Sequence, residues 1–145
     1  MKMVDVGDKA RTERIAVASA RLRMLPATQE AIREGRIEKG DVLAAARIAG
    51  VMAVKRTPDV IPLCHPIGIS GVEVVPEFVP EGIAFRVTVR TVERTGVEME
   101  ALLAASAAAL TVYDMCKSID RGMVVEQVQL ELKDGGRSGR WARGG

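Results

Sequence analysis

An aspartate and a lysine stand three residues apart in the segment Asp114-Met115-Cys116-Lys117, close enough to meet on one face of a helix. Such a pair is either a surface ion pair or a proton-transfer pair, in which Lys117 donates a proton once burial or neighbouring cations lower its pKa. The apolar segment before it, residues 104–112, favours a partly buried position. The spacing alone leaves both interpretations open.

A second segment, residues 96–102, places Glu98 and Glu100 where a long helix is expected to begin. The helix dipole favours acidic residues in a first turn, and this is the simpler explanation of the two carboxylates. A carboxylate at this position can also bind, at two points, a ring that carries adjacent N–H donors, such as guanine.

Two further segments carry reactive or charged side chains without a decisive pattern. Cys64 and His65, the only histidine, are adjacent, and adjacent side chains normally diverge, so they do not predict a nucleophile–base pair. The stretch Lys133–Gly139 sets glycines beside cations, a composition that either binds phosphate or forms a flexible tail. No cysteine or histidine spacing fits a zinc or iron–sulfur site, so no metal centre is expected.

Four strands are predicted by runs in which polar and apolar residues alternate, and Pro80-Glu81-Gly82 predicts a hairpin turn between the middle two. The predicted strands cover residues 14–24, 70–78, 83–92 and 123–132.

Three helices are predicted between these strands, at residues 26–35, 42–55 and 97–118. Pro26 suits a first helical turn, Asp41 suits an N-cap, and Thr57-Pro58 is expected to end the second helix. The order of elements predicts an α+β fold, with a ferredoxin-like antiparallel sheet and helices packed on one face.

Distance along the third helix separates its two charged segments. Glu100 and Asp114 are fourteen residues apart and therefore about 21 Å apart on one helix. One small substrate cannot touch both in a single chain. If both serve one site, a second chain must complete it, which predicts an oligomer.

Composition excludes several other functions. A net charge of +2 and only four aromatic residues argue against a nucleic-acid-binding surface. No apolar run reaches the roughly 20 residues of a membrane helix, and the polar start of the chain favours the cytoplasm. The length predicts one domain, residues 1–139, followed by a flexible tail at 140–145.

Five motifs together resemble the cyclic pyranopterin monophosphate synthase family, also called the molybdenum cofactor accessory protein C family. They occur in family order from Met3 to Gly139: MVDVGDKARTER, KGDVLAAARIAG, KRTPDVIPLCHPI, TGVEMEALLAASAAALTVYDMCKSID and LKDGGRSG. The resemblance implies a cytoplasmic lyase that converts 3′,8-cyclo-7,8-dihydroguanosine triphosphate into cyclic pyranopterin monophosphate and pyrophosphate. It also implies a homohexamer, a trimer of dimers with active sites between subunits, and a functional link to the radical GTP 3′,8-cyclase.

The resemblance also implies roles for individual residues. Asp114 and Lys117 would be the catalytic base and acid, and Glu98 or Glu100 would orient the base of the substrate. The remaining implied substrate-binding residues are Arg14, Lys39, His65 and Lys133 toward the triphosphate, together with Cys64 and Met99. No cofactor is expected, and magnesium enters only as a companion of the triphosphate, because no carboxylate cluster forms a metal site of its own.

Two other functions agree with the residues alone. A non-catalytic ferredoxin-like module that binds a nucleotide as a regulator predicts binding without turnover. A purely structural oligomer subunit predicts that substitution of Lys117 changes only stability.

Overall fold

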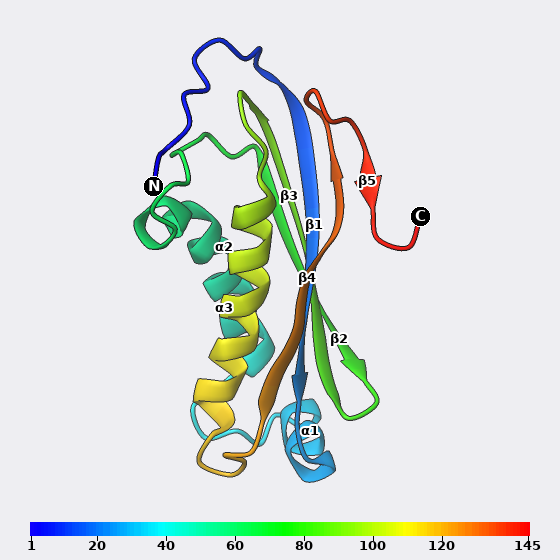
Figure 1. Cartoon of the computed structure of the whole chain (residues 1–145). Coiled ribbons are helices and arrows are strands. Elements are labelled where there is room, and N and C mark those ends of the chain that lie inside the picture. Colours follow the sequence, from blue (N-terminus) through cyan, green and yellow to red (C-terminus); the bar gives the residue numbers. More distant parts are fainter.

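Five strands form a single antiparallel sheet in the computed structural model of the chain, which describes residues 1–145 (Figure 1). The order across the sheet is β2-β3-β1-β4-β5. The strands are β1 (Thr12–Arg23), β2 (Gly71–Val79), β3 (Gly82–Glu93), β4 (Val124–Asp134) and β5 (Trp141–Ala142). The first four give the strand order of a ferredoxin-like fold, and the predicted α+β fold class is confirmed.

Three helices connect the strands: α1 (Pro26–Arg33), α2 (Val42–Val60) and α3 (Glu98–Cys116). Figure 1 shows α2 and α3 side by side on one face of the sheet, with α1 at the end of the sheet where β1 finishes. Asp41 caps α2 as predicted, because its carboxylate accepts a hydrogen bond from the Ala44 N–H at 3.0 Å.

Small side chains allow the helix layer to approach the sheet closely. The inward face of β1 carries Ala16, Ala18 and Ala20, and all three are completely buried. The side of α3 that meets the sheet is also rich in alanine, through residues such as Ala104 and Ala108. By length and composition α3 resembles a membrane span, but its buried face identifies it as the core helix of this fold.

The prediction that Thr57-Pro58 ends the second helix is wrong, because α2 continues through Pro58 to Val60. Proline has no N–H to donate to the preceding turn, so its cost is one hydrogen bond. The neighbouring bonds remain: Thr57 Oγ1 donates to the Ala53 carbonyl at 2.8 Å, and the Ile61 N–H donates to the Thr57 carbonyl at 2.9 Å. These contacts carry the helix one turn further.

The segment predicted as a flexible tail, residues 140–145, contains a short strand in the structure. In this strand Trp141 pairs with Lys133 of β4, and Ala142 pairs with Leu132. Arg143 extends the pairing, since its N–H donates to the Glu131 carbonyl at 2.8 Å. Backbone pairing with the edge of β4 therefore positions residues that composition alone describes only as glycine- and arginine-rich.

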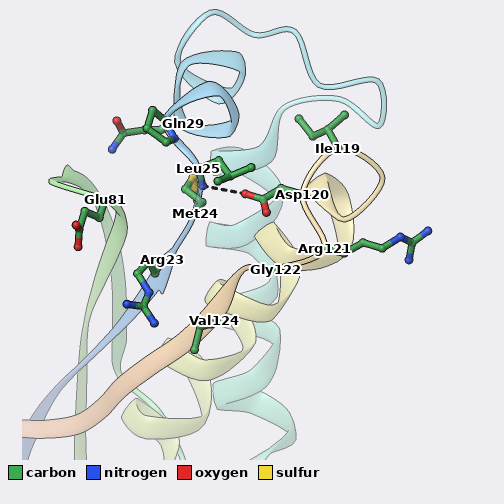
Figure 2. A pocket seen from close by; sticks show the side chains of 11 residues that line it. Arg23, Met24, Leu25, Gln29, Glu81, Ile119, Asp120, Arg121, Gly122 and Val124 are labelled. Carbon is green, nitrogen blue, oxygen red and sulfur yellow. Dashed lines mark hydrogen bonds between the residues drawn. The ribbon is translucent and has the colours of Figure 1, made fainter.

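Asp120, in the loop between α3 and β4, caps a helix that lacks a cap of its own. Leu25 precedes α1 and offers no side-chain oxygen. The Asp120 carboxylate instead accepts hydrogen bonds from the Leu25 N–H and the Thr28 hydroxyl, both at 2.9 Å. Figure 2 shows the carboxylate pointing at the backbone of Leu25. This contact connects the end of α3 to the start of α1.

Asp120→Ala should destabilise the fold by about 1–3 kcal/mol, because the buried Thr28 hydroxyl and the partly buried Leu25 N–H both lose their acceptor. Asp120 is only 6% exposed, so water does not readily replace it. Asp120→Asn is the matched control. It keeps one acceptor oxygen, so its free energy of unfolding should fall clearly less than that of Asp120→Ala. Chemical denaturation at fixed protein concentration measures both variants, and equal losses would contradict the capping role.

Candidate active site

Two lysines converge on the carboxylate of Asp114 in the last turn of α3. Lys117 Nζ lies 2.9 Å from Asp114 Oδ1, as the three-residue spacing predicted. Lys39, from the loop between α1 and α2, places its Nζ 3.4 Å from Asp114 Oδ2 and 3.0 Å from the Asp114 carbonyl. An ammonium group near the carboxyl end of a helix also meets the negative end of the helix dipole. These three residues are called the Lys–Asp–Lys cluster below.

The Lys–Asp–Lys cluster is exposed in the single chain. The side chain of Asp114 is 60% exposed and that of Lys117 is 46% exposed, so the partial burial expected from the apolar residues before them is wrong for the single chain. Most of those apolar residues are buried, but Leu110 is 56% exposed, and Asp114 follows it by one turn on the same outward side of α3. Hydrogen bonds from Lys117 and Lys39, with their positive charges, lower the pKa of Asp114.

The opposite end of α3 borders a cavity of about 310 Å³. The loop that follows α2 forms one wall, and the turn between β3 and α3 forms the other. Five residues singled out from the sequence meet here: Cys64, His65, Glu98, Met99 and Glu100. This group is called the Glu100 cavity below. No lysine or arginine lines it.

Glu98 and Glu100 differ sharply in their surroundings, although only one residue separates them. Glu100 is 2% exposed, whereas Glu98 remains partly exposed. Burial raises the pKa of Glu100 and outweighs the opposing effects of the Glu100 backbone N–H and the Cys64 thiol, which lower it, and the nearby charge of Glu98 adds to the upward shift. Glu100 Oε2 accepts a hydrogen bond from the Cys64 thiol at 3.5 Å, while Glu100 Oε1 is buried without a partner. Burial and the adjacent Glu100 raise the pKa of Cys64 to about 11, so Cys64 remains a thiol.

Arg14 and Lys133 lie near the start of β1 and the end of β4. Arg14 Nε donates to the Glu93 carbonyl at 3.0 Å. Lys133 Nζ donates to the Gly135 carbonyl at 3.1 Å and to the Ser138 hydroxyl. Gly135 has a φ of +100°, and a Cβ there would lie 2.2 Å from the Glu13 carbonyl oxygen, so only glycine lets this loop pass β1.

Three more cations lie around Arg14. Lys9 and Arg137 line a cavity of about 390 Å³ with Arg14, and Arg90 lines a second one of about 340 Å³. Neither Lys9 nor Arg90 was predicted from the sequence as a site residue. The signal for Arg90 was the alternation of β3, which directs Arg86 and Arg90 to the face away from the helices. These four cations outnumber the three carboxylates that line the same two cavities, Asp8, Glu13 and Asp134, and this excess of positive charge suits an anion.

Figure 1 shows the starts of β1 and α3 at one end of the molecule and the end of α3 at the other. The Arg14 region and the Glu100 cavity therefore lie at the first end, and the Lys–Asp–Lys cluster lies at the second. The 19 residues of α3 span about 28 Å between the ends. The loop before β2 joins the first two groups, since the Gly68 N–H donates to Glu93 Oε2 at 3.2 Å. A single chain therefore brings Lys39 to Asp114 and Lys117, and keeps it away from Arg14, His65 and Lys133.

A cavity of about 700 Å³ near α1 contains none of the residues predicted for the site (Figure 2). Its polar wall includes Asp120, whose carboxylate already caps α1. No group of three or more histidine, cysteine, aspartate or glutamate side chains is arranged to hold a metal ion.

Fold and site together describe a ferredoxin-like α+β protein in which an aspartate between two lysines lies at one end of α3 and a group of basic side chains lies toward the other. Residues 3–136 match the profile described as the MoaC family, and the chain belongs to this family.

Relatives named cyclic pyranopterin monophosphate synthase match almost the whole chain. The relative from Thermomicrobium roseum is 54% identical over 144 residues, which cover 98% of this chain and 87% of the relative. The relative from Herpetosiphon aurantiacus is 58% identical over 139 residues, covering 94% and 85%. The relative from Brevibacillus brevis is 53% identical over 144 residues, covering 99% and 90%.

Proposed function

We propose that the chain is an enzyme of molybdenum cofactor biosynthesis that forms cyclic pyranopterin monophosphate. Its substrate would be 3′,8-cyclo-7,8-dihydroguanosine triphosphate, and its second product pyrophosphate. The observation that carries this proposal is the identity above 50%, over nearly the full chain, to relatives named for that activity. The non-catalytic regulatory module gains no support from any such relative.

The basic residues at the Arg14 end suit the triphosphate. Arg14 and Lys133 are held by backbone carbonyls, and His65 lines the neighbouring Glu100 cavity. Fixed donors of this kind stabilise the charge that develops as pyrophosphate leaves. Glu98 and Met99 border the same cavity and would contact the guanine-derived ring. The partly exposed Glu98 carboxylate suits adjacent N–H donors.

The Lys–Asp–Lys cluster would supply the proton transfers. Lys117 would donate protons as the guanine-derived rings open and close, and Asp114 would accept them. A ribose-derived hydroxyl would then attack the α-phosphorus, losing its proton to the base, and the bond to pyrophosphate would break. Lys39, which the resemblance implies binds the triphosphate, lies 3.4 Å from Asp114 Oδ2 in the single chain and would hold that carboxylate in place.

An ionised, exposed Asp114 is a weak base, so the cluster needs a less aqueous environment during the reaction. A second subunit would provide it by bringing its Glu100 cavity to the Lys–Asp–Lys cluster of the first. This arrangement fits the homohexamer, a trimer of dimers, with sites between subunits. We also propose a cytoplasmic location, a substrate supplied by the radical GTP 3′,8-cyclase, and no cofactor except magnesium bound to the triphosphate.

Incubation of the purified protein with 3′,8-cyclo-7,8-dihydroguanosine triphosphate should yield cyclic pyranopterin monophosphate and pyrophosphate in equal amounts. Lys117→Ala should abolish both, because it removes the proton donor from the cluster. Chromatography of the pterin product and an enzymatic assay of pyrophosphate measure the two yields. Tight binding of this compound without formation of either product would contradict the enzymatic function and support the non-catalytic regulatory module.

A further inference from the structure

Glu100 carries the one carboxyl oxygen in the chain that is both buried and without a hydrogen-bond partner. The residue is 2% exposed, and its Oε1 has no donor from the protein. A negative charge in such a place is costly, because burial removes much of its hydration and no lysine or arginine lines the cavity beside it. The cavity beside it is lined by Cys64, His65 and Glu98 among titratable residues, with no lysine or arginine.

A neutral carboxylic acid removes this cost. Its hydroxyl oxygen donates one hydrogen bond and its carbonyl oxygen accepts others. The direction of the hydrogen bond between Cys64 and Glu100 identifies which carboxyl oxygen is the carbonyl oxygen and which is the hydroxyl oxygen. The thiol donates to Oε2 at 3.5 Å, and its only other acceptor, the His65 carbonyl, is farther away at 3.9 Å. Oε2 is therefore the acceptor, and the acid proton belongs on Oε1.

We propose that Glu100 meets the ligand as a neutral carboxylic acid that donates from Oε1, and that the Cys64 thiol is the positioning residue, because its hydrogen bond makes Oε2 the acceptor and leaves Oε1 as the protonated oxygen. The proposal rests on the function proposed above and specifies which hydrogen-bonding groups of the ligand the site recognises. Glu100 selects an acceptor, such as a ring carbonyl or an unprotonated ring nitrogen. Glu98, which is partly exposed, stays available for N–H donors. The two glutamates thus bind opposite hydrogen-bonding groups of one heterocycle.

The raised pKa of Glu100 agrees with this assignment and gives it a test without substrate. A carboxyl group with a raised pKa in the folded state holds its proton when the unfolded chain has lost it. Its contribution to stability is therefore complete below about pH 4.3, the pKa of an ordinary glutamate, and is lost as pH rises through the folded value. Within that window a one-proton difference changes the unfolding equilibrium by up to about tenfold per pH unit.

The first experiment compares the assembled wild type with Glu100→Gln, which cannot titrate. As pH rises from about 4 to 8, the melting temperature of the wild type should fall relative to that of the variant. In infrared difference spectra, the band of a protonated carboxyl group that disappears in Glu100→Gln should persist well above about pH 4.3. Glu98→Gln is the matched control, and it should retain that band. The proposal would be overturned if Glu100→Gln removed the band of an ionised carboxylate instead. It would also be overturned if the difference in melting temperature between wild type and Glu100→Gln did not change with pH.

The second experiment tests the positioning role of Cys64. The thiol bond favours the ionised carboxyl group, so Cys64→Ala should move the infrared midpoint of Glu100 to higher pH. The same variant should raise KM more than it lowers kcat, and Cys64→Ser, which keeps a donor, should reverse both changes. Equal behaviour of the alanine and serine variants would overturn the role of the thiol.

The infrared and melting measurements need no turnover. They decide the state of Glu100 even if the proposed reaction is not observed. Conversely, turnover with an ionised Glu100 would leave the proposed function in place and remove this inference alone.

Discussion

Asp114→Asn should reduce kcat by at least about a hundredfold, the usual minimum contribution of a positioned acid or base. Asparagine keeps the shape of the side chain, but it carries no charge and accepts no proton. Lys39 and Lys117 would also lose the anion that now lies between them, at 3.4 Å and 2.9 Å. Initial rates of pyrophosphate release, measured at saturating substrate, test the loss.

The fold should survive this substitution, because the Asp114 side chain is 60% exposed in the single chain. Glu30→Gln is a matched control: Glu30 also forms an ion pair three residues along a helix, with Arg33, and its side chain is 54% exposed. The control should keep the wild-type rate and elution volume in gel filtration. A fully active Asp114→Asn enzyme would remove Asp114 from the mechanism and leave Lys117 as the only candidate for proton transfer.

The regular elements of this fold follow from local patterns. Alternation along the chain predicts the strands because the two faces of the sheet differ, one covered by α3 and the other open. The long helix was predictable because its alanines, leucines and valines recur without proline or glycine. The error at Pro58 arose where tertiary contact matters more than propensity. Thr57 is completely buried against the core, and this packing holds the last turn of α2.

The candidate site was predictable in its residue types but not in its grouping. Lys39 and Asp114 are 75 residues apart, and nothing local indicates that a loop returns the lysine to the end of α3. The difference in burial between Glu98 and Glu100 could not be predicted from the sequence either. Residues two apart on a helix point in nearly opposite directions, so one of them must face inward. Only the packing of α3 against the sheet and α2 decides that Glu100 is the buried one.

Mixed oligomers should recover activity from two inactive chains. One chain carries Lys117→Ala and lacks a working Lys–Asp–Lys cluster. The other carries His65→Ala and lacks a complete Glu100 cavity. Each protein alone should be inactive, but a site formed by the intact end of each chain contains every required residue. Because about 28 Å of helix separates the two ends, this rescue requires a site shared between subunits.

The expected recovery follows from random assembly. With equal amounts of the two chains, half of all clusters and half of all cavities are intact, so about a quarter of the sites are complete. Co-expression with two different affinity tags, followed by purification on both, yields the mixed oligomers for the activity assay. Lys117→Ala mixed with Asp114→Asn is the matched control, since both changes damage the same end and no complete site can form. Activity near a quarter of the wild type, with none in the control, requires a shared site. Mixed oligomers without activity would place the whole reaction at one end of a single chain, and either Lys117 or His65 would then have no direct part in it.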